Sequence, residues 1–243
     1  MDNIKLIIFD LDGTLIDSLD DLTDATNHML VSLGRKPVGR DQVRGYVGQG
    51  ARRLAEKAMP NAVPEEIEVG LSTFLAYNEE HIVDKTRLYP GAGETLEALR
   101  DRGITLTVVS NKNVALCRKV LSTLGAEDFF AVVVGADSLP QRKPSPEPLL
   151  LVLRQFGVAP EQAVMVGDSI NDIAAGKAAS MVTVGCGWGY GDPSEIRDAD
   201  YRINALPELL DLPVFREAAD PGAPGREDSY DSHESPFRKN PVE

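Results

Sequence analysis

Short apolar runs alternate with longer amphipathic segments through most of the chain. The run Ile4–Phe9 is rich in β-branched residues and is too short for a buried helix, so it predicts a buried strand. From residue 93 onward, segments with helical spacing alternate with similar apolar runs. The predicted helices cover 93–102, 114–124, 146–156 and 170–179, and the predicted strands cover 104–110, 131–135, 163–167 and 181–185. Such alternation indicates a parallel sheet with helices on both faces.

The stretch that follows the first strand has a different pattern. Helical spacing predicts one helix over 17–33, ended by Gly34, and another over 64–82. A third helix is expected to begin near Gly50 and to stop before Pro60. No clear strand pattern occurs among these residues, so they predict a helical domain inserted between the first strand and the rest of the sheet.

These patterns predict an α/β protein with two domains and a tail. Residues 1–16 and 86–212 are expected to form a Rossmann-like parallel sheet core, and residues 17–85 an inserted helical cap domain. Residues 213–243 are rich in Pro, Gly, Ser and charge, which predicts a flexible C-terminal tail.

Composition narrows the classes of partner. The chain has 243 residues, of which 42% are hydrophobic, enough for a full core, and its formal net charge is -13. Nucleic acids and anionic membranes need basic patches, so we expect neither as a partner, and an anionic substrate must be attracted by local cations. No apolar run approaches the ~20 residues that span a bilayer, and no leader pattern precedes the first strand. Two distant cysteines, Cys117 and Cys186, fit a reducing compartment. We expect a cytoplasmic monomer or homodimer.

Chemically active side chains follow three of the predicted strands. They are Asp10 and Asp12, then Ser110 and Asn111, then Asp168 with Asp172 one helical turn later. Because the carboxyl ends of parallel strands share one edge of a sheet, we expect these side chains to meet there. Lys143 lies between the second and third groups in the chain and is expected to join them.

The paired carboxylates Asp10 and Asp12 repel each other unless a cation or a shared proton relieves them. Mg²⁺ prefers hard oxygen ligands, which the side chains of Asp10 and Asp168 and the backbone carbonyl of Asp12 would supply. A carboxylate and a phosphate oxygen about 4 Å apart repel by about 4 kcal/mol at an effective dielectric constant of 20. Mg²⁺ and Lys143 would offset that repulsion, so the pattern predicts chemistry on a phosphate.

Each of these residues has a simpler explanation when it is taken alone. Asp168 would serve as a helix cap, Ser110 and Asn111 likewise, and Lys143 as a solvated surface lysine. Four matching segments in the correct order favour the catalytic interpretation over coincidence.

Four segments, "DLDGTLIDS", "VVSNK", "RKPSPEP" and "GDSINDIAAGKAA", resemble the four ordered motifs of the haloacid dehalogenase (HAD) superfamily of phosphohydrolases. The resemblance covers about residues 4–212 and implies a HAD-like core with a cap inserted after the first motif. It also implies that Asp10 is the nucleophile and that Asp12 is the general acid and base. Dehalogenating members lack an acid at the position of Asp12, which argues against that activity.

The resemblance implies further roles. Thr14, Ser110 and Asn111 would hold the phosphoryl oxygens, and Lys143 would stabilise negative charge. Mg²⁺ would be bound by Asp10, the backbone of Asp12 and Asp168, with Asp172 as an auxiliary ligand. Covalent catalysis through an aspartyl-phosphate would divide one difficult step into two easier ones.

Three further segments, "DSLDDLTDATNHML", "GYVGQGARRL" and "YPGAGETLEALRDRG", resemble the phosphoglycolate phosphatase subgroup. Gly48 and Gly50 are predicted to let backbone amides approach a small anion at a helix N-terminus, with a plain interhelical turn as the alternative. Arg52 is predicted to reach a substrate carboxylate, with a solvated helical arginine as the alternative.

The sequence therefore predicts a Mg²⁺-dependent phosphatase for a small phosphomonoester, with 2-phosphoglycolate as the expected substrate and glycolate and phosphate as products. A pyrophosphatase, a sugar-phosphate phosphatase and a β-phosphoglucomutase-like isomerase are alternatives within the superfamily. A non-catalytic module that binds a phospho-ligand is a third hypothesis. The nucleophile beside an acid argues against it, since a binding protein needs neither.

Overall fold

A computed structural model describes residues 4–215 of the chain. Its centre is a six-stranded sheet in the order β5-β4-β1-β6-β7-β8, and every neighbouring pair is parallel. The strands are β1 (Leu6–Phe9), β4 (Thr105–Val109), β5 (Val132–Val134), β6 (Ala163–Gly167), β7 (Val182–Cys186) and β8 (Tyr201–Ile203). The predicted α/β, Rossmann-like class is confirmed.

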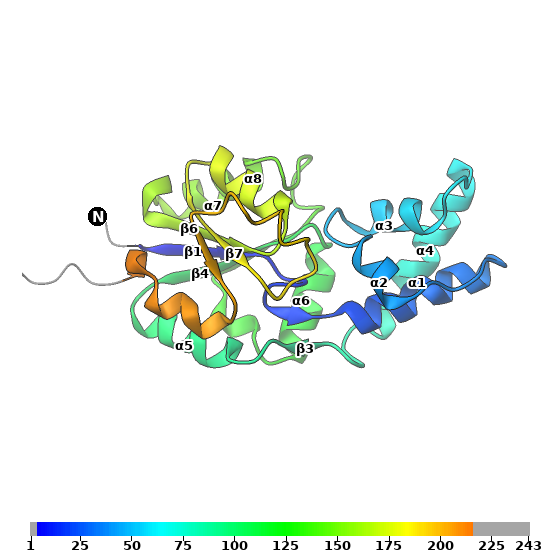
Figure 1. Cartoon of the computed structure of the whole chain (residues 1–243), viewed down its shortest axis with the longest axis horizontal. Helices are drawn as coiled ribbons and strands as arrows, with labels where there is room; N and C mark the ends of the chain where they lie inside the picture. The colour runs from blue at the N-terminus through cyan, green and yellow to red at the C-terminus, as the bar shows by residue number, and fades with distance from the viewer. Residues whose placement is uncertain (1–3, 216–243) are drawn as a thin grey trace, which may run out of the picture.

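Helices cover both faces of this sheet (Figure 1). They are α5 (Ala92–Asp101) and α6 (Val114–Thr123) on one face, and α7 (Glu147–Phe156) and α8 (Ile170–Ala178) on the other. Strand β1 shows how the sequence dictates this arrangement, because successive side chains of a strand point to opposite faces. Ile7 and Phe9 pack in the core cluster that includes apolar residues of α5 and α6, whereas Leu6 and Ile8 pack with those of α7 and α8.

Four helices gather at one end of the molecule, beyond the carboxyl ends of the strands (Figure 1). They are α1 (Leu19–Ser32), α2 (Arg40–Arg44), α3 (Ala51–Ala58) and α4 (Pro64–Glu80), and we call them the cap. The cap has its own core, in which Met29, Leu54 and Phe74 are buried. The chain enters and leaves the cap through two short antiparallel strands, β2 (Ile16–Asp17) and β3 (Arg87–Leu88).

The sequence analysis did not predict several short elements. Helix α2 buries only Val43, and β2, β3 and β8 have two or three residues each, too few for a recognisable period. Short 3-10 helices lie at Glu127–Phe129, Pro160–Gln162, Leu206–Asp211 and Pro213–Phe215.

The last of these 3-10 helices changes the predicted tail. Phe215 is buried in the core, so Pro213–Phe215 belong to the folded domain because they cover its apolar surface. The remainder of the predicted tail, 216–243, lies outside the described residues. No helix within 4–215 is long and apolar enough to cross a membrane.

Candidate active site

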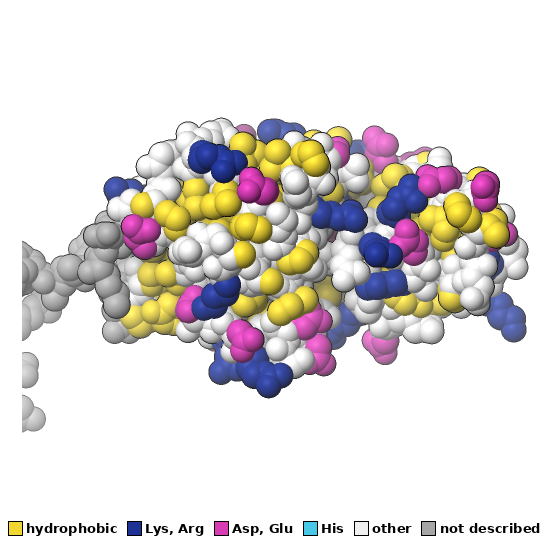
Figure 2. Space-filling model, turned by 90° about the horizontal axis from the view of Figure 1, so that it is seen from above, with side chains coloured by type: hydrophobic (Ala, Val, Ile, Leu, Met, Phe, Trp, Pro, Cys, Tyr) yellow, Lys and Arg dark blue, Asp and Glu magenta, His cyan; other side chains and the backbone are white. Residues whose placement is uncertain are grey.

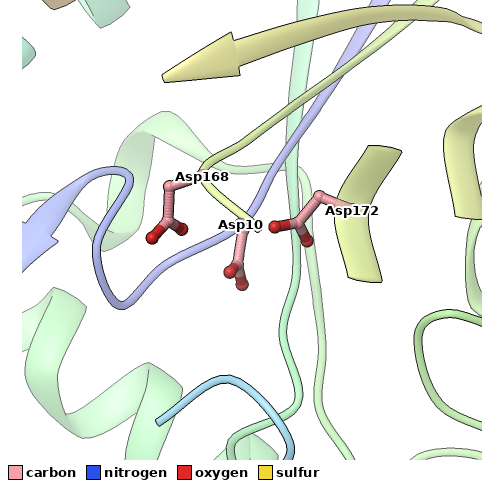
Figure 3. Close-up of side chains that lie close together, drawn as sticks. All are labelled: Asp10, Asp168 and Asp172. Carbon is pink, nitrogen blue, oxygen red and sulfur yellow. The ribbon is translucent and has the colours of Figure 1, made fainter. Parts of the chain in front are cut away.

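Three aspartates from two neighbouring strand ends form the centre of the site. Asp10 follows β1, Asp168 follows β6, and Asp172 lies in the first turn of α8. One carboxylate oxygen from each lies within 4.8 Å of the other two. Figure 3 shows the three side chains next to one another at the edge of the sheet. The topology thus assembles the acids that the sequence analysis expected to meet.

Burial makes two of these carboxylates, Asp10 and Asp168, resist ionisation. It raises the pKa of Asp10 to about 6, an effect that the Lys143 ammonium opposes and the Asp172 charge reinforces. Burial also raises the pKa of Asp168 to about 7, and the charges of Asp172 and Asp10 add to the shift. The cluster therefore favours an additional cation.

Lys143 supplies one positive charge to the cluster. Its Nζ lies 2.9 Å from Asp10 Oδ1 and 2.6 Å from Asp172 Oδ1, and it donates a hydrogen bond to the carbonyl of Val109. It meets the two carboxylate oxygens outside hydrogen-bond geometry, so within residues 4–215 both remain without a hydrogen-bond partner. The Lys143 side chain is almost completely buried, so it lies at the acids and not on the surface.

The donor set fits Mg²⁺. Three carboxylates and one ammonium leave an excess of negative charge, and Asp10 has an oxygen without a hydrogen-bond donor. Hard oxygen donors with room for water are what Mg²⁺ prefers. Asp172 is the most constrained of the three, because its Oδ2 accepts from the backbone and hydroxyl of Ser169 while its Oδ1 faces Lys143.

Thr14 contacts a different group from the one that the sequence analysis expected. Its buried hydroxyl donates to Asp168 Oδ1 at 3.0 Å. The other oxygen of Asp168 accepts from the backbone of Tyr190 at 2.7 Å. Thr14 therefore orients Asp168, and its predicted contact with a phosphoryl oxygen stays a prediction.

Asp12 is held by two side chains that the sequence analysis did not assign. Ser18 donates its hydroxyl to Asp12 Oδ1 at 2.5 Å, and Lys112 Nζ lies 3.0 Å from the same oxygen and 3.2 Å from Oδ2. Both members of the Asp12–Lys112 pair are largely buried, so water screens the attraction less than at the surface. Asp12 is therefore fixed beside Asp10 by a specific cation.

We expect Lys112→Met to lower kcat/KM by about tenfold to a hundredfold, because Asp12 loses the cation that orients it; tenfold corresponds to about 1.4 kcal/mol. Steady-state kinetics with any accepted phosphate ester measures the effect. The matched control is Lys36→Met, since Lys36 is an exposed cap residue. Equal activity of the two variants would contradict the assignment.

Asn111 connects the core to the cap. Its amide nitrogen donates to the carbonyl of Gly48 and to that of Lys143, each at 2.9 Å. Asn171 of α8 also donates to Gly48 O, at 3.2 Å. Ser110, next to Asn111, is buried and lines the same cavity as Asp10. The cap loop at Gly48 thus lies against the strand ends.

Gly50 is brought to the site, whereas Arg52 is not. Gly50 has a positive φ of 84°, and a Cβ there would lie 2.9 Å from Arg142 Nη1 and 3.0 Å from Asn111 O, so this close approach requires glycine. Arg52 is exposed on α3 and pairs with Glu68 at 2.6 Å, away from the aspartates. The two positions differ because Gly50 precedes α3 and meets the core through its backbone, whereas Arg52 extends from an exposed face of α3.

Comparison with known families agrees with this geometry. The sequence model of the haloacid dehalogenase-like hydrolase family matches residues 7–186, a segment that contains Asp10, Lys143 and Asp172. The chain belongs to this family.

Two relatives and one solved structure show how close the similarity is. A phosphoglycolate phosphatase of Chromobacterium violaceum is 38% identical over 215 residues, covering 86% of this chain and 96% of the relative. One from Neisseria meningitidis is 40% identical over 221 residues, covering 87% and 94%. The crystal structure of a protein described as a predicted phosphoglycolate phosphatase from Haemophilus somnus has a TM-score of 0.84 at 33% identity, covering 87% and 98%.

The sequence analysis missed several residues of this haloacid dehalogenase-like hydrolase, among them Ser18, Lys112, Tyr190 and Asn171. Lys112 follows Ser110–Asn111 directly within "VVSNK", and that adjacency was the available signal. Tyr190 lies in the glycine-rich segment after β7, and its hydroxyl contacts the backbone of Ser18 at 2.6 Å. Asn171 lies beside Asp172 in the fourth motif, but its contact with the cap has no local signal.

The hydrolase has a cavity of about 60 Å³ between the strand ends and the cap. Its core side includes Asp10, Asp12, Ser110, Asn111 and Lys112. A second hollow of about 550 Å³ also reaches Asp10 and Asp12 and is lined by basic and acidic residues of the cap and core. Figure 2 shows Lys and Arg side chains on one face near the junction of core and cap, which are local cations in a chain of net charge -13.

Proposed function

We propose that this hydrolase is a Mg²⁺-dependent phosphatase that converts 2-phosphoglycolate to glycolate and inorganic phosphate. The observation that carries the proposal is Asp10: its Oδ1 has no hydrogen-bond donor within residues 4–215, lies 2.9 Å from Lys143 Nζ, and belongs to a residue that lines the same cavity as Asp12. A carboxylate placed in this way is suited to attack a phosphate. The relatives named phosphoglycolate phosphatase support the choice of substrate.

The cavity that Asp10 and Asp12 line is covered by apolar residues of the cap. The apolar cap residues that line it exclude water once the ester is bound, and exclusion of water strengthens every charge interaction inside.

In the first step, an oxygen of Asp10 attacks phosphorus and the bond from phosphorus to the ester oxygen breaks. Asp12 gives its proton to the departing oxygen, so glycolate leaves with its hydroxyl restored. Lys143 holds Asp10 in place and offsets the charge that gathers on the phosphoryl oxygens. Mg²⁺, held by Asp10, Asp168 and the backbone of Asp12, supplies the remaining positive charge when bound.

In the second step, water attacks the phosphorus of the aspartyl-phosphate while Asp12 accepts one of its protons. The bond from phosphorus to Asp10 breaks, which restores the carboxylate and releases phosphate. Lys112 and Ser18 keep Asp12 directed at the site through both proton transfers. The net reaction is hydrolysis, in which the ester and water give the alcohol and inorganic phosphate.

We also propose that the enzyme binds a small phosphomonoester and neither nucleic acid nor membrane. Its proposed location is the cytoplasm, and its proposed state is a monomer or a homodimer.

The test is phosphate release from a panel of esters in the presence of Mg²⁺. We expect kcat/KM for 2-phosphoglycolate to exceed that for glucose 6-phosphate, glycerol 3-phosphate and pyrophosphate by at least about tenfold. A better sugar phosphate or pyrophosphate would contradict the substrate assignment and leave the phosphatase chemistry intact. A sugar phosphate that returns as an isomer, without free phosphate, would indicate a mutase.

A further inference from the structure

The roof of the cavity above Asp10 has an unusual composition. The cap residues that line it are Leu22, Val47, Gly48, Gly50, Ala51, Leu54, Phe74, Leu75 and Asn78. Asn78 is the only one of these cap residues with a polar side chain. A single amide in an otherwise apolar wall is a feature that orients a ligand, because small-molecule sites are mostly apolar with a few placed polar groups.

Asn78 has no protein partner for its amide. It lies on α4, is 3% exposed and lines the cavity, and none of the side-chain hydrogen bonds among residues 4–215 involves it, although its polar atoms are not among those fully closed off from the cavity. A buried amide without a partner is unfavourable, so polar groups inside proteins are nearly always hydrogen-bonded. The Asn78 amide is therefore open to a partner in the cavity, which is either water or a bound ligand.

One other feature of the cavity favours an anion as the bound ligand. Helix α3 begins at Ala51, one of the roof residues, and its N-cap, Gly50, has no side chain to satisfy the first N–H groups. The N-terminus of a helix attracts negative charge. This feature disfavours a neutral hydroxyl as the group that Asn78 meets.

We propose that Asn78 is the residue that recognises the substrate carboxylate, donating an amide N–H to it beside the N-terminus of α3. The inference rests on the proposed function, because it assigns the second anionic group of 2-phosphoglycolate to a place in the same cavity. The phosphoryl group lies at Asp10 and the carboxylate under the roof. Asn78 suits this role because a neutral donor binds the carboxylate without drawing the phosphoryl group away from the floor.

The experiment compares two esters that differ only in this group. The full chain with Mg²⁺ is assayed with 2-phosphoglycolate and with 2-hydroxyethyl phosphate, in which a hydroxymethyl group replaces the carboxylate. We expect the wild type to prefer 2-phosphoglycolate. In Asn78→Leu that preference falls about tenfold or more, chiefly through KM, while kcat/KM for 2-hydroxyethyl phosphate stays within about twofold. Asn78→Asp, which is isosteric, lowers the preference further because it repels the carboxylate.

Two controls separate recognition from structure. Glu79→Gln changes an exposed neighbour on α4 and is expected to leave both esters unaffected. Asn78→Leu removes an amide without a partner, so its melting temperature is expected to equal or exceed that of the wild type. A lower melting temperature with equal losses on both esters would mean that Asn78 is structural and would overturn the proposal.

The remaining outcomes are also decisive. A selective wild type with an equally selective Asn78→Leu would overturn the role of Asn78 and leave the proposed function standing. A larger loss on 2-hydroxyethyl phosphate would show that Asn78 binds a hydroxyl, which overturns the carboxylate assignment. A wild type that hydrolyses both esters equally would overturn the proposed substrate itself, and the carboxylate site with it.

Discussion

Asp10→Asn is expected to lower kcat for phosphate release by about 10⁴-fold or more, the scale on which removal of a nucleophile acts. The amide oxygen is neutral and attacks phosphorus poorly, so the covalent step is lost. Since each tenfold change corresponds to about 1.4 kcal/mol, the expected increase in the activation barrier exceeds about 5 kcal/mol. Steady-state phosphate release with 2-phosphoglycolate measures the change.

The same variant has clear controls. Asp101→Asn alters an exposed aspartate of α5 and is expected to retain full activity. Mass spectrometry of acid-quenched wild type should find a phosphoryl adduct on Asp10, which Asp10→Asn cannot form. Asp10→Asn also removes one of three crowded carboxylates, so we expect the Mg²⁺-free variant to melt no lower than the wild type. Activity above about 1% of wild type would contradict a nucleophilic role.

Removal of Mg²⁺ with EDTA is expected to abolish phosphate release and to make stability strongly dependent on pH. In the metal-free protein the pKa of Asp10 is raised from 3.8 to about 6, and that of Asp168 from 3.8 to about 7. Between about pH 4 and 7 the folded state therefore binds more protons than the unfolded state. The free energy of unfolding falls as pH rises through this window, by an amount on the order of 3 kcal/mol from Asp10 alone.

Mg²⁺ is expected to flatten this dependence, because a bound cation favours the ionised carboxylates. Urea unfolding at pH 5, 6, 7 and 8, with Mg²⁺ and with EDTA, measures the free energy of unfolding directly. The net charge of -13 also affects acid stability, so the matched control is Asp168→Asn, which alters the cluster and changes the total charge by one. The same pH slope in the metal-free wild type and in Asp168→Asn would show that the cluster does not cause it.

For Asp168 the sequence predicted the position in the fold but not the hydrogen-bond partners. Its position after a buried strand and before a helix predicted that it would lie at the sheet edge with Asp10, and it does. Two of its hydrogen bonds come from Thr14 and from the backbone of Tyr190, which are 154 and 22 residues away along the chain. No local sequence pattern predicts these hydrogen bonds, because the partners lie far from Asp168 in the chain.

In the cap, too, the sequence indicated the position of some residues and not of others. Glycines in "VGQG" were predicted to let backbone amides approach a small anion, which stays a prediction, and the structure shows Gly48 and Gly50 against the strand ends. Arg52, two residues further along the chain, was expected at the site because of its charge alone. Helix α3 directs it toward Glu68, since the face of a helix that meets the core is set by how the helix packs.

The sequence by itself determined the alternation of strands and helices, the insertion of the cap after the first strand, and the meeting of Asp10, Asp168 and Asp172 at one edge. These follow from hydrophobic periodicity and from the handedness of parallel crossovers, which are local or topological rules. Only the tertiary structure decided that Lys112 holds Asp12, that Thr14 faces Asp168, and that Asn78 faces the cavity. Those contacts depend on how the cap and core pack together, and the energy that fixes this packing comes from residues distant in the chain.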